Sequence, residues 1–221
     1  MRSESHSPLY MEGKEVSQVK FFKYLRVLLD ECLSFNDHIN YVMSKVASGL
    51  GLLSRLRGCL TTEEANKIYL STVLPILSYC DTCFCPLRST NRTTLERLQG
   101  RAARIVYGFK PDITTESILE NLRWPPLIRT IEKHCALLIN KCLVGEVPSY
   151  LKDYFMLRSQ SDNQHRCTRS SITDIILPTF HLDVAKKSFY YHGAMTFNSL
   201  PMNIKTLPPK ERFPTISAFY S

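Results

Sequence analysis

The strongest constraint on the fold is a helical period between residues 34 and 57, where apolar side chains recur at spacings of three and four. This spacing is typical of one face of an α-helix, and Ser34 has a side chain that can cap the first turn. The residues on this face are Ile39, Val42, Val46, Leu50, Leu53 and Leu56. Because a helix with one apolar face must bury it against other elements, the sequence predicts a bundle of packed helices.

Two further helices are predicted from their start signals and their period. Thr61 and Glu64 have the spacing of a capping box, in which each side chain bonds a free backbone amide of the first turn. Pro75 lies further along the same segment and removes one backbone hydrogen bond, so we expect the helix to bend there. Residues 127–144 form a strongly apolar helix, in which Cys135 and Cys142 lie on one face and are expected in the core.

Shorter elements complete a mainly α fold. A helix that Thr114 or Thr115 caps, and another over residues 184–197, follow the same rules. Residues 14–29 alternate apolar and polar side chains and are rich in Val, Phe and Tyr, which predicts a small β-hairpin. The polar composition of residues 158–171 predicts a linker. The expected organisation is a segment with the hairpin at 1–30, a helical domain at 31–157, the linker at 158–171, and extended chain with helices at 172–221.

The composition favours a protein that stays inside the cell. The chain has eight cysteines, but its first residues lack the apolar core of a signal peptide. We therefore expect reduced thiols in the cytoplasm or nucleus, and no secretion. No apolar run approaches the roughly 20 residues that span a bilayer, so no membrane partner is expected. The net charge of +8 favours a polyanionic partner such as nucleic acid.

The positive charge is concentrated between residues 86 and 110, where six basic residues stand against one acid. The basic residues are Arg88, Arg92, Arg97, Arg101, Arg104 and Lys110. Thr93 and Glu96 have capping-box spacing, and Gly108 is well placed to end a helix. This segment is therefore predicted to be a helix with an unusual excess of cations.

In that helix, the apolar and basic residues separate onto opposite sides. The apolar side would hold Leu95, Leu98, Ala102, Ile105 and Val106. The opposite side would hold Arg97, Arg101 and Arg104. A basic outer face often does no more than keep a helix hydrated, so the pattern by itself leaves solvation and phosphate binding as two interpretations.

Metal-binding patterns are weak. Cys80, Cys83 and Cys85 offer the sulfur ligands that zinc accepts, but no further His or Cys follows until His134. A structural zinc site usually pairs two close ligands with two more, so we expect free thiols and neither a metal nor a cofactor. The scattered histidines are given no role: His38, His134 and His192.

Catalytic patterns are weak as well. Phosphoryl transfer with two metal ions needs carboxylates that converge on both ions, and the chain has no Asp-Asp pair. The neighbouring acids have structural explanations, because Asp30 and Glu31 follow a strand, while Glu63 and Glu64 lie in the first turn of a helix. We therefore expect no catalytic residues and no self-contained enzyme.

Four segments resemble, in the same order, the region that follows the catalytic palm in reverse transcriptases of non-LTR retrotransposons, the LINE elements of jockey and CR type. They are "KYLRVLLDECLSFNDHI" at 23–39, "GLLSRLRGCLT" at 51–61, "VLPILSYCDT" at 73–82 and "LERLQGRAARIVYG" at 95–108. Residues 144–151 and 193–205 are similar to the C-terminal segments of the same polyproteins. Arg26 stands where the family has glycine, and Phe197 stands where it usually has tryptophan.

This resemblance implies a helical, thumb-like bundle without the endonuclease, fingers or palm, and so without polymerase activity of its own. In the family, the stretch that matches Lys23, Tyr24 and Leu25 forms a hairpin that grips the primer end. The helices after it form the thumb, which closes on the template–primer duplex. The residues that we expect to contact the backbone of RNA or DNA, independently of sequence, are Arg92, Arg97, Arg101, Arg104 and Lys110.

Two other interpretations remain open. The chain could be a helical protein–protein interaction module, whose apolar faces bind the missing palm or a full-length protein of a related element. It could also be a decayed fragment of an element, with no selected function.

Overall fold

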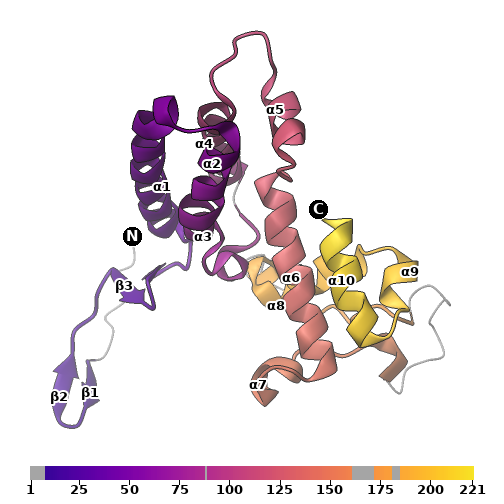
Figure 1. The fold of residues 1–221 in the computed structure, drawn as a ribbon. Helices are drawn as coiled ribbons and strands as arrows, with labels where there is room; N and C mark the ends of the chain where they lie inside the picture. Colours follow the sequence, from indigo (N-terminus) through magenta and orange to yellow (C-terminus); the bar gives the residue numbers. More distant parts are fainter. Residues whose placement is uncertain (1–7, 88, 161–171, 181–184) are drawn as a thin grey trace. The chain divides into compact units, whose positions relative to one another are not determined.

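The structure is a computed structural model that describes residues 8–87, 89–160, 172–180 and 185–221 (Figure 1). The chain divides into two compact units, with the boundary between Tyr41 and Val42, and each is described by itself. The fold is mainly α, which confirms the prediction, and the paired strands of the described ranges belong to the first unit. None of the helices in these ranges contains an apolar stretch that could span a lipid bilayer.

The first unit contains two antiparallel hairpins, each of two strands. The strands are β1 (Leu9–Met11), β2 (Lys14–Val16), β3 (Phe21–Tyr24) and β4 (Val27–Asp30). Each pair is joined by a two-residue turn in which both residues have positive φ, namely Glu12 with Gly13 and Leu25 with Arg26. Such turns match the twist of the strands that they join. The strand prediction for residues 14–29 covers the second hairpin but does not include β1.

Asp30 organises the chain between β4 and the first helix. Its carboxylate accepts hydrogen bonds from the amides of Cys32 at 3.0 Å, Ser34 at 2.9 Å and Phe35 at 2.8 Å. Partial burial opposes ionisation of Asp30, but the bonds from Ser34, Phe35 and Cys32 outweigh it and lower its pKa. Asp30 thus shapes a turn.

Helix α1 (Asn36–Leu56) is the longest helix of the described residues. The amide of Asn36 donates to Ser34 Oγ at 3.4 Å, close to the predicted start. Most of the predicted apolar face is buried: Ile39, Val42, Val46, Leu50 and Leu53. Leu56 was predicted in the core but is 43% exposed, because the α-helix ends there and the tighter turn η1 (Arg57–Cys59) follows.

The next helical segment changes its hydrogen bonding midway. Thr61 and Glu64 form the predicted capping box at the start of α2 (Thr62–Ile68). The chain then continues through the π-helical turn η2 (Tyr69–Val73) into α3 (Leu74–Ser78), where Pro75 lies in the first turn. Regular α-helical bonding is therefore interrupted directly before Pro75, which has no amide to donate. A short turn, η3 (Asp81–Phe84), follows.

The remaining helices are α4 (Ser89–Tyr107), α5 (Thr115–Leu122), α6 (Leu127–Val144), α7 (Ser149–Lys152), α8 (Phe189–Asn198), α9 (Met202–Lys205) and α10 (Pro209–Phe219), with the 3₁₀ turns η4 (Arg158–Gln160) and η7 (Ala185–Lys187). Thr114 caps α5 by accepting from the amide of Ser117, as predicted. Helix α8 begins later than predicted, because Ser188 caps it; residues 181–184 lie outside the described ranges.

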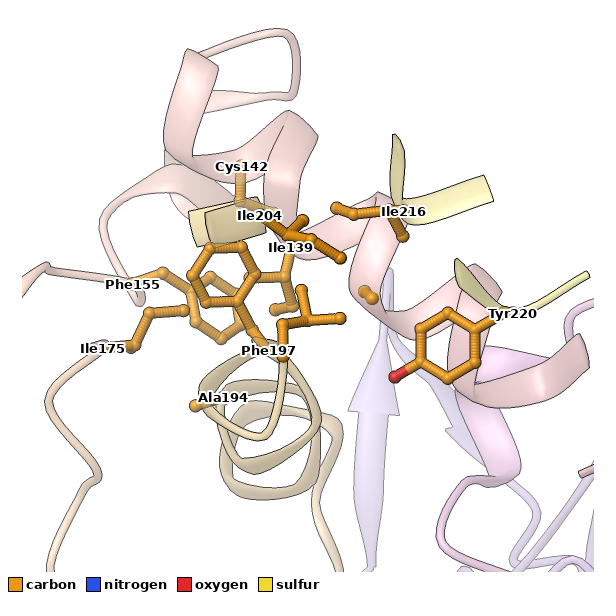
Figure 2. Close-up of a cluster of buried hydrophobic side chains, with 11 residues drawn as sticks. Ile139, Cys142, Phe155, Ile175, Ala194, Phe197, Ile204, Ile216 and Tyr220 are labelled. Atoms are coloured by element: carbon orange, nitrogen blue, oxygen red, sulfur yellow. The ribbon is translucent and has the colours of Figure 1, made fainter. Parts of the chain in front are cut away.

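One hydrophobic cluster of the second unit joins α6 to α8, α9 and α10 (Figure 2). Its larger members are Ile139, Phe155, Ile175, Phe197, Leu200, Ile204, Ile216 and Tyr220. Cys142 belongs to it, and Cys135 is also fully buried, so the predicted core positions of both are confirmed. Residues before and after the predicted linker therefore share one core, while residues 161–171 of that linker lie outside the described ranges. The predicted domain boundaries stay predictions.

Candidate functional site

Helix α4 carries the candidate nucleic-acid face. Arg97 and Arg101 are exposed and Arg104 is half-buried. At the pitch of an α-helix, the three lie within an arc of roughly 60°. The buried residues are Leu95, Gln99, Gly100, Ala102, Ala103 and Val106, and all of them except Gly100 lie on the other side of the helix. The amphipathic helix is confirmed, although Leu98 and Ile105 of the predicted apolar side are only half-buried.

The predicted start of this helix was wrong. Helix α4 begins at Ser89, and the Thr93 hydroxyl donates to the Ser89 carbonyl inside the helix at 3.0 Å. Glu96 is paired with Arg92 at 3.0 Å, so Thr93 and Glu96 form no capping box. The chain upstream already supplies a full helical turn, which the capping signal could not reveal. The predicted end is confirmed, since Gly108 follows the helix with φ 92° and its amide bonds the Arg104 carbonyl.

A buried glutamine fixes the inner side of α4. The Gln99 side chain is almost fully buried, and its amide nitrogen donates to the Pro125 carbonyl at 2.8 Å. Its oxygen accepts from the amide of Leu127, the first residue of α6, at 2.9 Å. Next to Pro125, the Trp124 ring stacks on Tyr69 with centroids 3.9 Å apart. The segment between α5 and α6 is therefore held between η2 and α4.

Arg57 holds the C-terminal end of α4. Its Nε donates to the carbonyls of Ile105 and Val106 at 3.1 and 3.2 Å, and the same guanidinium bonds the Leu60 carbonyl and the Thr62 hydroxyl. A cation at this position satisfies carbonyls that have no partner within the helix and interacts well with the helix dipole. Sequence reasoning missed this role, because Arg57 is distant from α4 in the chain.

Arg104 and Gly100 bring α4 against the start of α5. Arg104 Nη2 donates to Thr115 Oγ1 at 2.9 Å. A Cβ atom added at Gly100 would lie 2.9 Å from the Thr115 methyl group, so glycine allows this close approach. Arg104 is thus held in position by a neighbouring helix.

The other two predicted phosphate contacts are separate from this face. Arg92 is tied to Glu96 and lies roughly 120° to 180° around the helix from the three arginines. Lys110 follows the end of α4, with its Nζ 5.4 Å from the centre of the Tyr107 ring. The structure therefore places Arg97, Arg101 and Arg104 together and leaves Arg92 apart. We call the three the arginine face.

The predicted primer-grip residues lie on the second hairpin of the first unit. Lys23 and Tyr24 are exposed on β3, and Lys23 Nζ lies 5.3 Å from the centre of the Tyr41 ring. Leu25 is exposed in the turn with φ 45°, and Arg26 has φ 68°. Arg26 thus adopts a left-handed conformation that glycine takes without strain.

A thiol and imidazole cluster lies in the second unit, and sequence spacing did not indicate it. Cys85 Sγ is 3.5 Å from His192 Nδ1, and the donor atoms of Cys85, Cys135 and His192 all lie within 4.8 Å of one another. A hydrogen bond with Cys135 is the main cause that lowers the pKa of Cys85. Burial acts in the opposite direction, but a hydrogen bond with His192 also lowers the pKa, which falls to about 6. The same bond with Cys85, together with burial, raises the pKa of Cys135.

The other predicted free thiols and the other two histidines lie outside this cluster. Cys80 and Cys83 are free, and neither joins the cluster. His134 Nδ1 pairs with the buried carboxylate of Asp81 at 2.6 Å. His38 is buried, and its Nδ1 accepts from the Leu28 amide at 3.4 Å.

Comparison with known proteins gives a distant relationship. The chain is 25% identical over 138 residues to a Drosophila melanogaster protein described as "Probable RNA-directed DNA polymerase from transposon X-element". The match covers 61% of this chain and spans 15% of that protein. The chain matches no protein-family model and no solved structure. This similarity supports a relationship to the RNA-directed DNA polymerases of transposons.

Proposed function

We propose that this chain is a thumb-like module, derived from a non-LTR retrotransposon reverse transcriptase, that binds the phosphate backbone of RNA or DNA without regard to sequence. The arginine face carries this proposal, because three cations share one accessible side of a helix. The distant similarity to a transposon polymerase gives the proposal its context.

The arginine face suits phosphates by charge and by chemistry. Between Arg97 and Arg104 the helix rises by roughly 10 Å, so the three guanidinium groups can follow a nucleic-acid strand. Each planar guanidinium can donate two parallel hydrogen bonds to one phosphate. Among the described residues, Arg97, Arg101 and Arg104 take part in no ion pair. Their charge is therefore available to a polyanion.

The face is also preorganised. Gln99 fixes the inner side of α4 to the start of α6, and Arg57 fixes its C-terminal end. A helix that is already held in place loses less conformational entropy when it binds. Contacts made through phosphates alone carry no base information, so affinity should be weak and independent of sequence.

The first test is a fluorescence anisotropy titration with labelled RNA and DNA duplexes of two unrelated sequences. We expect a dissociation constant on the order of 10⁻⁴ to 10⁻⁶ M at physiological salt, similar for both sequences. Alanine at Arg97, Arg101 and Arg104 should weaken binding. A strong preference for one sequence would contradict a backbone-binding module. The chain alone should not extend a primer, because it has no Asp-Asp pair to hold two metal ions.

A second candidate function is favoured by the hairpins of the first unit. Leu9, Tyr10 and Met11 of β1 and Phe21 and Phe22 of β3 are all more than half exposed. Exposed apolar side chains on open strand edges favour a protein partner, for which the palm or a full-length protein of a related element is the natural choice. The test uses purified chain in which alanine replaces the arginine face, together with a separately expressed palm domain. Binding between the two would support a protein-interaction role that does not depend on nucleic acid.

A further inference from the structure

Three elements that are distant in the sequence bring Cys85, Cys135 and His192 together. Cys85 directly follows η3, Cys135 lies in the middle of α6, and His192 lies on α8. Each of these elements contacts the other two. The cluster is therefore set by the packing of the second unit and is independent of any single loop.

The donor atoms have the separation that a small metal ion requires. Zinc bonds of roughly 2.3 Å to sulfur and 2.0 Å to nitrogen, in a tetrahedron, place neighbouring donors about 3.5 to 3.8 Å apart. The distance from Cys85 Sγ to His192 Nδ1 is 3.5 Å, and no pair of donors is separated by more than 4.8 Å. Only a small inward movement would close the site around an ion.

The surroundings leave the donors directed at one another. The Thr196 hydroxyl donates to the carbonyl of His192 at 2.9 Å, and it also lies 3.5 Å from His192 Nδ1, the same distance as Cys85 Sγ. Cys85 and Cys135 are buried, whereas His192 is only half-buried. The half-buried imidazole is therefore the side from which an ion would enter, and a water molecule would be its fourth ligand.

We propose that Cys85, Cys135 and His192 bind one zinc ion, which joins η3, α6 and α8. Two sulfurs and one imidazole nitrogen form a donor set that suits zinc. The three bonds form as the ion loses water, and every proton on the two sulfurs and on His192 Nδ1 passes to solvent, which leaves two thiolates and a neutral imidazole as ligands. This site is separate from the arginine face, and it replaces the expectation of no metal that sequence spacing gave.

The test titrates the reduced, metal-free chain with Co²⁺, whose visible and near-ultraviolet bands report tetrahedral coordination and sulfur ligands. We expect one Co²⁺ per chain with bands that indicate two thiolates, and Zn²⁺ should displace it. Cys85→Ser, Cys135→Ser and His192→Gln should each lower the affinity by at least about tenfold. Cys83→Ser is the matched control, since Cys83 is exposed two residues before Cys85 and outside the cluster.

A second measurement does not depend on the variants. Zinc should raise the melting temperature of the unmodified chain, because a ligand that binds only the folded state stabilises it. The proposal is overturned if the reduced, folded chain shows no thiolate bands and no melting shift. It is equally overturned if Cys83→Ser loses as much affinity as Cys85→Ser. A Cys85–Cys135 disulfide that forms in air, from a reduced chain that binds no Co²⁺, would show an oxidisable thiol pair instead.

Discussion

The two units of the chain differ in what they do with their apolar side chains. In the first, every residue of β1, β2 and β3 is exposed, and Val27 is the one buried residue of β4. In the second, each long helix buries one face, and four helices meet in one cluster. Isolated two-stranded hairpins are marginally stable in water, whereas packed helices bury enough surface to be stable. The comparison indicates that the first unit depends more than the second on a partner for its stability.

The units also differ in backbone conformation. Among the described residues, seven other than glycine have positive φ, and five of them belong to the first unit. They are Glu12, Leu25, Arg26, Leu33 and Phe35. Helices α4 and α6 of the second unit end instead at Gly108 and Gly145, which adopt such angles at little cost. The first unit is therefore less stable both in its packing and in its turns.

The largest effect should come from the core of the second unit. Replacing Phe197 with alanine removes a buried ring from the cluster of α6, α8, α9 and α10. The free energy of unfolding should fall by about 3 to 5 kcal/mol. Phe22→Ala, at an exposed position of β3, should change it by less than about 0.5 kcal/mol. Urea denaturation of both variants measures the difference. Equal losses of unfolding free energy would contradict the claim that the two units differ in packing.

A smaller loss should follow from Gln99→Ala. This change leaves the Leu127 amide and the Pro125 carbonyl without their partner in a buried place. Unfolding free energy should fall by about 1 to 3 kcal/mol. Thr93→Ala, on the exposed side of the same helix, is the control and should have little effect. A neutral Gln99→Ala variant would mean that α4 is not anchored through this side chain.

A gain in stability is expected at the turn of the second hairpin. Arg26→Gly replaces a residue with φ 68° by one that tolerates this angle, which should stabilise the β3–β4 pair by roughly 1 kcal/mol. Gly13→Ala, at φ 76°, should destabilise the β1–β2 pair. Amide hydrogen exchange across residues 19–29 should be fast in the unmodified monomer and slower in Arg26→Gly. Slow exchange in the unmodified monomer would contradict the claim that this hairpin is only marginally stable.

The smallest effect concerns Asp30 and pH. Since the pKa of Asp30 in the folded chain lies below its ordinary value, ionised Asp30 stabilises the turn at neutral pH. This contribution is present above the ordinary pKa and is lost as pH falls through the folded pKa. Exchange at the amides of Ser34 and Phe35, corrected for intrinsic rates, should therefore show loss of protection under strongly acidic conditions. An Asp30→Asn variant should lack this pH dependence; if it retains it, another group is responsible.

The sequence predicted the parts of the fold that depend on the spacing of apolar residues along one helix and on the residues that begin or end a helix. The α1 face, the Thr61–Glu64 box and the end of α4 at Gly108 all follow from side chains within a few turns of one another. The anchoring role of Gln99 was not predicted, because a polar residue interrupts the pattern of apolar side chains on the buried face. Its partners lie beyond the next helix.

The candidate sites show the same limit. The separation of Arg97, Arg101 and Arg104 from the buried face is a property of one helix, so the sequence could show it. Cys85, Cys135 and His192 meet only because η3, α6 and α8 pack together. Cys80 and Cys83 are close to Cys85 in the sequence, whereas Cys135 and His192, which lie beside it in the fold, are distant in the chain.

The most direct test of the central claim is the salt dependence of nucleic-acid binding. If Arg97, Arg101 and Arg104 contact phosphates, replacing all three with alanine should reduce the slope of log K against log salt by roughly two to three. The control replaces Arg129, Lys152 and Lys210, three exposed cations on α6, α7 and α10 that carry the same total charge. We expect the control to keep most of the slope. Equal losses from both variants would show that net charge alone drives binding and that the arginine face is not a site.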